Sequence, residues 1–401
     1  YTARGGALSF AVGPQMTEGN KNDPGLPGLS RRSFLKMAGA IGASAFLLSH
    51  GAEVAKAIEA SPTKLVWLRG AGCGGCTSSF LNGGNPEVMS ALSRIKLDLS
   101  YHEGLMCQQG IYVDGAAANN EQSNSLVKLN KVLQGADYLL IVEGAILNGP
   151  GGSGKYHMNG GVPLKDMVEQ ASKGASQVLA LGTCASYGGI SRALEDEVRD
   201  ARGLGYTGTS DSKGLLFGQG IHKKLINVPG CPAHPDWALL TIADLLAGIE
   251  VETDTYQRPR AFFGNQSVHE SCSRRGYFDR AVRSKVFGEE TCLFEMGCKG
   301  PQAYADCPVR RWNGGTSMCT QSGGPCIACV EPGFPEAFMP FFKKSESRDV
   351  FADLNVDTAA RIVLGAAALG AGVHAVKRLA IGESDRDEYD IPDIDEKKRV
   401  L

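Results

Sequence analysis

The chain has 401 residues, of which 43% are hydrophobic and 21% are charged, and its formal net charge is −2. This composition is typical of a globular protein with room for one or two domains. It has no basic excess, which argues against nucleic acid as a partner, and twelve cysteines in this length are too sparse for a small disulfide-bonded scaffold.

Residues 1–57 have the features of a targeting segment, and Met16 is a candidate for the true start. Arg31 and Arg32 precede a mildly apolar run at 37–48, and the small-residue sequence AKA follows. A basic region, a short apolar region and such a cleavage pattern make a secretory signal. The paired arginines indicate the twin-arginine route; the alternative is a chance pair ahead of a core helix.

The twin-arginine route favours a protein that carries a cofactor. This route exports proteins already folded, so thiols can be loaded with metal before they meet an oxidising compartment, where bare thiols form disulfides. We therefore expect a cysteine-rich chain with this signal to bind a metal cofactor.

From residue 58 to 250 the chain alternates strand-like and helix-like segments. The spacing of apolar residues at 124–135 predicts a helix that a glycine ends. Alternation of this kind is typical of a parallel, doubly wound α/β sheet, in which ligands bind beyond the carboxyl ends of the strands. Short apolar runs predict the strands at 64–68, 97–101, 138–142, 177–181 and 225–228.

Four cysteines follow strands of this sheet, and we call them the proximal set. Cys73 and Cys76 come after the first strand, Cys184 after the fourth and Cys231 after the fifth. Because the carboxyl ends of parallel strands meet at one edge, we expect the four thiols to converge. One C-x-x-C pair with two distant cysteines favours an iron–sulfur cubane, and zinc is the alternative, although zinc sites usually use two short-spaced pairs.

Residues 251–345 are rich in loops and hold seven more cysteines. We expect such a segment to bury little apolar surface, so that metal ligation would supply folding energy. With the proximal set, the candidate ligands make three sites of four, and Cys107 is left over as a small buried or partly exposed thiol. The two further sets are the distal set, His269, Cys272, Cys292 and Cys298, and the medial set, Cys307, Cys319, Cys326 and Cys329.

Six motifs occur in a fixed order along the chain: GCGGC, GTCASYGG, VPGCPAHPDW, H-x-x-C, GCKGP and PCIACVEPGFP. Together they resemble the small, electron-transferring subunit of nickel–iron hydrogenases, over residues 64–342 and the twin-arginine leader. The resemblance implies a flavodoxin-like domain at 58–250 with the proximal cluster, and a domain at 251–345 with the medial and distal clusters.

The resemblance also gives the three sets their names and cofactors. The proximal set would hold a 4Fe–4S cluster next to the nickel–iron site of a partner large subunit. The distal set would hold a 4Fe–4S cluster with His269 as one ligand, and a neutral imidazole in place of a thiolate raises the potential. The family's nickel–iron centre needs four thiolates, which this chain does not have to spare, so hydrogen splitting would belong to the complex.

The medial and proximal clusters each carry a finer prediction from the same resemblance. In many standard members a proline stands seven residues before the first cysteine of PCIAC, and the medial cluster is 3Fe–4S. Here that residue is Cys319, which predicts 4Fe–4S, as in nickel–iron–selenium relatives; 3Fe–4S is the alternative if the thiol points away. Oxygen-tolerant members have two extra proximal cysteines, but Gly75 and Gly189 stand there, so we expect an ordinary cubane.

Residues 346–401 form a C-terminal tail. The uncharged stretch 362–376 would span about 22 Å as a helix, and 358–380 about 34 Å, against a hydrocarbon core of about 30 Å. Membrane-bound members of the family have an anchor helix here, and His374 would lie near its far end, close to a cytochrome b partner. The alternative is a helix that packs on a partner, and the acidic end would be solvated.

These observations favour the electron-transfer subunit of a periplasm-facing uptake hydrogenase, an H2:acceptor oxidoreductase, exported folded and held at the membrane. A higher oligomer of such heterodimers is a further option. The alternatives are the cluster subunit of a quinone-reducing or energy-converting complex and a zinc-stabilised binding module.

Overall fold

A computed structural model of the chain describes residues 63–83, 97–106, 120–193, 198–208, 213–217, 219–246, 249–343 and 369–372. Its contacts divide the chain into a compact unit that ends at Lys343 and a second unit that begins at Lys344. The targeting segment, Cys107 and the tail other than residues 369–372 lie outside the described residues.

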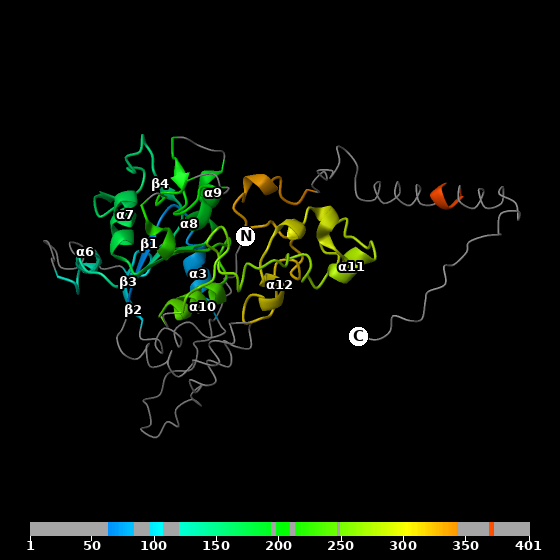
Figure 1. The fold of residues 1–401 in the computed structure, drawn as a ribbon, viewed down its shortest axis with the longest axis horizontal. Helices are drawn as coiled ribbons and strands as arrows, with labels where there is room; N and C mark the ends of the chain where they lie inside the picture. The colour runs from blue at the N-terminus through cyan, green and yellow to red at the C-terminus, as the bar shows by residue number, and fades with distance from the viewer. Residues whose placement is uncertain are drawn as a thin grey trace, which may run out of the picture. The chain divides into compact units, whose positions relative to one another are not determined.

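A five-stranded parallel sheet is the centre of the first unit (Figure 1). All its neighbouring strands are parallel, in the order β2-β1-β3-β7-β9. In chain order this is 2-1-3-4-5, the flavodoxin-like arrangement, so the predicted fold is confirmed. Each strand lies within one residue of its predicted ends: β1 (Lys64–Arg69), β2 (Asp98–His102), β3 (Tyr138–Glu143), β7 (Gln177–Leu181) and β9 (Leu225–Val228).

Strands β1, β3 and β7 are largely apolar because both faces of the sheet are covered. Leu65 and Trp67 of β1 point into one apolar core, and Val66 and Leu68 into the other. The central strand β3 is buried along its whole length. This arrangement leaves the strand ends as the places where polar groups and thiols can be displayed.

Helices cover the two faces (Figure 1). On one face lie α6 (Ser125–Leu133) and α7 (Leu164–Gly174), and on the other α3 (Gly75–Leu81) and α10 (Pro235–Leu246). The helix predicted at 124–135 is α6, and the side chain of Asn124 caps it by accepting a hydrogen bond from the Leu126 N–H at 3.0 Å. Short elements complete this part: α8 (Thr183–Tyr187), α9 (Gly189–Arg192), η1 (Ile221–Lys224), and the antiparallel pairs β4 (Ile146–Leu147) with β8 (Ala201–Arg202) and β5 (Met158–Asn159) with β6 (Val162–Pro163).

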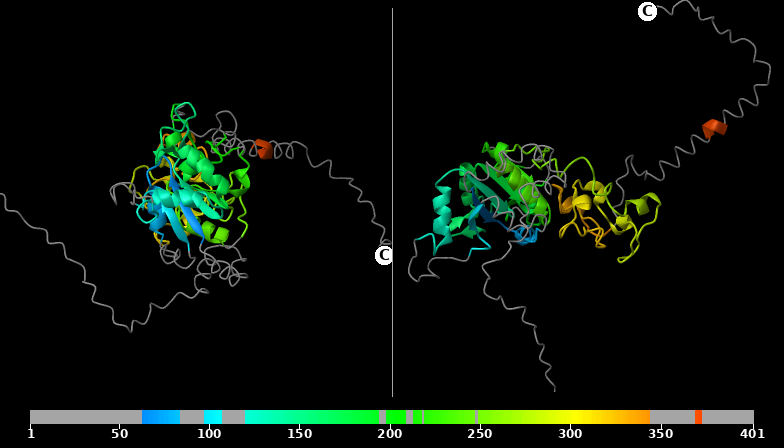
Figure 2. Two further views of the ribbon diagram at one scale, coloured as in Figure 1. Left: turned by 90° about the vertical axis from the view of Figure 1, so that its left-hand side faces the viewer. Right: turned by 90° about the horizontal axis from the view of Figure 1, so that it is seen from below.

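Residues 249–343 are rich in loops, as predicted, and lie beside the sheet (Figure 2). The expectation that they bury little apolar surface is wrong. Phe262, Phe263 and Met318 are buried in the same core as Trp237 of α10, whose indole N–H donates to Asp306 at 2.6 Å. Their helices are short: α11 (Arg275–Asp279), α12 (Cys307–Arg310), η2 (Leu293–Met296), η3 (Gly300–Gln302) and η4 (Glu336–Phe338).

The predicted domain boundary at residue 250 stays a prediction. Residues on both sides of it belong to one compact unit with a shared apolar core. Because the loop-rich part shares this core, it does not need a separate apolar core of its own.

Candidate functional site

The four cysteines of the proximal set line one hollow at the carboxyl edge of the sheet. The hollow measures about 300 Å³, part of it open to solvent. Cys73 follows β1, Cys76 lies in the first turn of α3, Cys184 lies in α8 after β7, and Cys231 follows β9. Cys73 is exposed and the other three are partly buried. The structure thus brings these four thiols together, as the parallel topology predicts.

The backbone around the proximal hollow approaches the sulfur atoms closely. The Gly75 N–H points at Cys73 Sγ at 3.3 Å, and the Ala233 N–H points at Cys76 Sγ at 3.5 Å. Gly182 has φ +86°, and a Cβ there would lie 2.4 Å from Cys76 Sγ. Only glycine fits this position, and N–H groups directed at sulfur suit thiolates that bind a cluster.

Burial favours the neutral thiol at three of the proximal cysteines, Cys76, Cys184 and Cys231. It raises the pKa of Cys231 to about 11, and it raises the pKa values of Cys76 and Cys184 as well. A bound metal supplies the positive charge that deprotonates such a thiol outright. The donor set therefore fits a metal cluster.

The distal set lines a second hollow, of about 310 Å³, together with Arg274 and Arg275. The imidazole of His269 packs edge-to-face on Phe278 with ring centres 4.5 Å apart. Burial, followed by the charge of Arg275, lowers the pKa of His269, which leaves the neutral ring that can bind a metal. The backbone N–H of Arg274 points at Cys272 Sγ at 3.4 Å.

The medial set lies in residues 307–329. After burial, the neighbouring thiols of Cys329, Cys326 and Cys319 contribute to the raised pKa of Cys307, so the four lie near one another. Cys307 begins α12, and the Ala328 N–H points at Cys326 Sγ at 3.5 Å. Cys319 is the exposed member.

Hydrogen bonds connect the medial set to both other sets. The Thr183 hydroxyl accepts from the Gly230 N–H at 2.9 Å and donates to the Cys329 carbonyl, which joins the proximal loops to the medial set. At the other side the Cys326 N–H points at Cys298 Sγ at 3.3 Å. The spatial order of the sets is therefore proximal, medial, distal.

The three sets suit clusters better than single ions, because the ligands of a cubane are spread around a larger body. Within the described ranges, no three or more His, Cys, Asp and Glu side chains are placed so as to hold a metal ion. Ligation by the twelve residues stays a prediction.

Comparisons with known proteins agree with this arrangement. The family model for the C-terminal part of the NiFe/NiFeSe hydrogenase small subunit matches residues 264–342, and that of the NADH ubiquinone oxidoreductase 20 kDa subunit matches residues 73–245. The F420 non-reducing hydrogenase II small subunit of Methanosarcina mazei is 46% identical over 365 residues, which cover 88% of this chain and 94% of the relative. This chain belongs to the small-subunit family of nickel–iron hydrogenases.

More distant relatives of this small subunit include a solved structure. The periplasmic NiFeSe hydrogenase small subunit of Desulfomicrobium baculatum is 32% identical over 335 residues, covering 78% of this chain and 98% of the relative. The structure of the H2-activated NiFeSe hydrogenase from that organism matches with a TM-score of 0.59 at 30% identity, over 71% of this chain and 100% of the other. The protein is thus a subunit of a hydrogenase, with an electron-transfer role.

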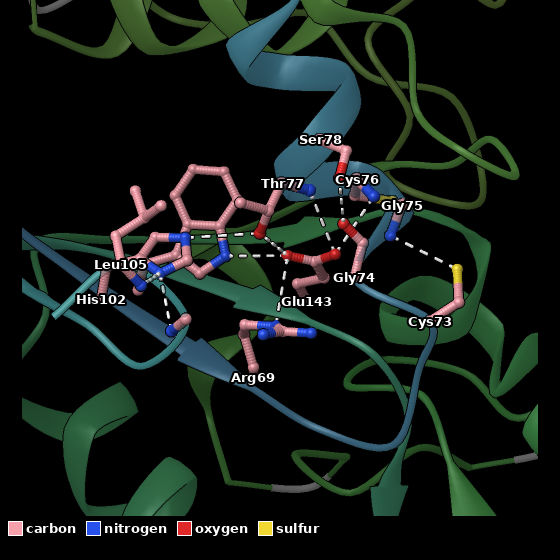
Figure 3. Close-up of polar contacts among 12 residues, drawn as sticks. Arg69, Cys73, Gly74, Gly75, Cys76, Thr77, Ser78, His102, Leu105 and Glu143 are labelled. Carbon is pink, nitrogen blue, oxygen red and sulfur yellow. Dashed lines mark hydrogen bonds and ion pairs between the residues drawn. The ribbon is translucent and has the colours of Figure 1, made fainter. Parts of the chain in front are cut away.

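Sequence reasoning missed one residue of the small subunit's proximal hollow, the buried carboxylate Glu143 at the end of β3 (Figure 3). Its Oε1 accepts from the backbone N–H groups of Cys76 and Thr77, both at 3.1 Å. Its Oε2 accepts from the Trp67 indole at 3.2 Å and from the Thr77 hydroxyl. The sequence marks this residue only as a single charge at the end of the otherwise apolar run YLLIVE, which does not show whether the carboxylate is buried.

His102 extends this network from β2 (Figure 3). Its Nδ1 accepts from the Gly104 and Leu105 N–H groups at 3.0 and 3.2 Å, so the ring proton lies on Nε2, 3.3 Å from the Thr77 hydroxyl. Burial lowers the pKa of His102 to about 4, so the ring is neutral. The network therefore ties β1, β2 and β3 to the first turn of α3.

The predicted membrane helix lies almost wholly outside the described residues. Among the residues that the structure does describe, no helix combines the length and apolar character needed to cross a membrane.

Proposed function

We propose that this small subunit holds three iron–sulfur clusters and conducts electrons from hydrogen, oxidised in a separate large subunit, to an acceptor at the membrane. The observation that carries the proposal is the arrangement of the candidate ligands. The proximal and distal sets each line one hollow, and the medial set is hydrogen-bonded to Thr183 of the proximal hollow and to Cys298 of the distal set.

The residues of the three sets support specific clusters. The proximal thiols suit a 4Fe–4S cluster, and the distal set suits a 4Fe–4S cluster with a neutral imidazole ligand from His269. With Cys319 as a fourth thiolate, the medial set suits 4Fe–4S, and without it 3Fe–4S. When bound, such clusters accept and release single electrons at potentials set by ligands, charge and hydrogen bonds.

The large subunit would sit over the proximal hollow. Cys73 is the exposed thiol of that hollow, which opens to solvent there. Gly75 and Gly189 flank the same thiols, since a Cβ at Gly189 would lie 2.8 Å from Cys184 Sγ and one at Gly75 would lie 3.0 Å from Cys73 Sγ. This placement supports the prediction that extra cysteines at these positions would reach the cluster, and that their absence here means an ordinary cubane.

The location and the acceptor are part of the proposal. Arg31 and Arg32 support export by the twin-arginine route, and the Desulfomicrobium baculatum relative is named as periplasmic. The tail at 358–380 would anchor the complex, with a cytochrome b or another quinone-linked subunit as the next carrier. The Methanosarcina mazei relative is named as not reducing F420, which agrees with a different acceptor.

One observation favours a second candidate. The sheet part matches the family model of an NADH ubiquinone oxidoreductase subunit, which suits a cluster subunit of a quinone-reducing complex. That model ends at residue 245 and leaves the distal and medial sets unexplained, whereas the hydrogenase model covers residues 264–342. We therefore place this candidate second.

The test is purification of the complex from membranes, followed by counts of iron, sulfide and nickel. We expect brown protein with broad absorbance near about 400 nm and about twelve iron atoms per small subunit, as three cubanes require. Cys184→Ser should lose about four iron atoms and stop hydrogen-dependent dye reduction, whereas Cys107→Ser, at the unassigned thiol, should match the wild type. Colourless protein that contains zinc, or normal dye reduction by Cys184→Ser, would contradict the proposal.

A further inference from the structure

The two end sites are lined by side chains of opposite charge. Glu143, which is 3% exposed, is the charged side chain among the non-cysteine residues that line the proximal hollow. The distal hollow is lined by Arg274 and Arg275. Since reduction adds negative charge to a centre, fixed charges at these places act on the two ends of the route in opposite senses.

The contacts of Glu143 fit an ionised carboxylate. Every hydrogen-bond partner described above donates to it, and Arg69 Nε lies 4.0 Å from Oε2. An ionised carboxylate only accepts hydrogen bonds, and low polarity around it strengthens its field. Glu143 Oε1 accepts from the backbone N–H of Cys76, one of the candidate proximal ligands, at 3.1 Å, so the charge lies directly beside the proximal set. Negative charge on the proximal ligands is thus disfavoured by Glu143.

At the distal end Arg274 is held by neutral groups. Its Nη1 donates to the carbonyls of Glu289 and Thr291 at 2.9 and 2.7 Å. Its backbone N–H points at Cys272 Sγ at 3.4 Å, and Arg274 lines the hollow that holds the distal thiols. No carboxylate in the described part of the chain forms an ion pair with Arg274 in the contacts above.

The other arginines near the distal hollow are offset by carboxylates. Arg275 contacts Asp279 at 2.7 Å, and Arg283 contacts Glu295 at 3.2 Å. A neighbouring negative charge therefore weakens the electrostatic fields of Arg275 and Arg283. This makes Arg274 the better candidate for a residue that acts on the reduction potential of the distal centre.

We infer that Glu143 and Arg274 are positioning residues that bias the electron route outward, Glu143 by lowering the reduction potential of the proximal centre and Arg274 by raising that of the distal centre. Each transfer moves one electron from centre to centre and forms or breaks no bond; hydrogen oxidation supplies the electrons and the membrane acceptor takes them. The inference rests on the proposed function. It assigns a role in the direction of electron flow to two residues that are not candidate ligands.

The test measures midpoint potentials of the purified complex by electron paramagnetic resonance. Glu143→Gln keeps the shape and removes the charge, and it should raise one potential by at least about 59 mV, a tenfold change in a one-electron equilibrium. Arg274→Gln should lower a different potential, that of the centre whose signal shows nitrogen coupling from His269. The matched controls Glu143→Asp and Arg274→Lys keep the charges and should shift these potentials less.

The outcomes separate this inference from the proposed function. Wild-type complex without cluster signals would refute the proposed function. Normal wild-type signals with unmoved potentials in both glutamine variants, or equal shifts in the charge-keeping controls, would overturn the inference alone. If Glu143→Gln does not load iron, Arg69→Gln serves as the second variant. It keeps the carboxylate and removes the nearby cation, so the reduction potential of the proximal centre should fall. An unchanged proximal potential in Arg69→Gln would overturn the inference.

Discussion

Replacement of Arg258 by methionine should destabilise the small subunit by about 3–5 kcal/mol. Arg258 is 6% exposed, and its guanidinium contacts Asp254 at 2.8 Å and Glu331 at 3.3 Å. Methionine fills much of the same volume but leaves two partly buried carboxylates without their cation. Removal of one partner from a buried ion pair costs about this much because the remaining charge is uncompensated.

The loss should depend on pH in a defined direction. Burial raises the pKa of Glu331, and Arg258 opposes that rise, so the pKa should rise further in the variant. A carboxyl whose pKa is raised by folding stabilises the fold when protonated and loses that stabilisation as pH rises through the raised value. The deficit of Arg258→Met should therefore be largest near about pH 7.5 and shrink as the pH falls toward about 5.

The change should also reach the medial set. Glu331 follows Cys329 by two residues and accepts from the Tyr304 N–H at 2.8 Å, and Arg258 Nη1 contacts the Val330 carbonyl at 3.4 Å. We expect Arg258→Met to lose iron first from the medial site.

The assay is thermal unfolding of the purified complex across this pH range, together with iron counts. Arg260→Met is the matched control, because Arg260 is exposed and its guanidinium bonds only the Thr253 carbonyl among the contacts described; its stability should stay within about 0.5 kcal/mol of the wild type. Equal stability of the two variants, or a deficit that grows on acidification, would refute the reasoning.

Three further predictions concern the cofactors and the ends of the chain. Cys319→Pro should convert the medial centre to 3Fe–4S, seen as a strong resonance in the oxidised protein; the same resonance in fresh, anaerobically handled wild type would show that Cys319 is not a ligand. Replacement of Arg31 and Arg32 by lysine should leave cluster-loaded protein in the cytoplasm, and normal export on cell fractionation would contradict the targeting assignment. Truncation before Asp357 should release active complex without detergent; an intact complex that already fractionates as soluble would contradict the anchor prediction.

The sheet and the proximal hollow could be predicted because they follow from local pattern and topology. Strands buried on both faces read as continuous apolar runs, and β7 and β9 begin and end at the predicted residues. A parallel sheet places its carboxyl ends at one edge, so thiols after β1, β7 and β9 had to lie together.

The charged groups around the sites could not be predicted in the same way, because their partners are distant in sequence. Glu143 is held by Trp67, which lies 76 residues earlier, and by the N–H groups of Cys76 and Thr77. Nothing in the local pattern of β3 tells a solvated carboxylate at a strand end from one that is buried against another strand. Phe262 shows the same limit for the loop-rich part, since its burial depends on α10.

The order of the three sets in space differs from their order along the chain, and the path of the backbone explains the difference. The chain passes from the proximal set at Cys231 to the distal set at Cys298, and only then returns to form the medial set. On its return it bonds back to the distal loops, where the Lys299 N–H donates to the Cys326 carbonyl at 2.7 Å. It then reaches the proximal loops, where Thr183 donates to the Cys329 carbonyl. The returning segment at 319–329 therefore lies between the other two sets. Under the proposed function it would complete the electron route, and residues that fix it, such as Thr183, should matter to electron transfer although they are not candidate ligands.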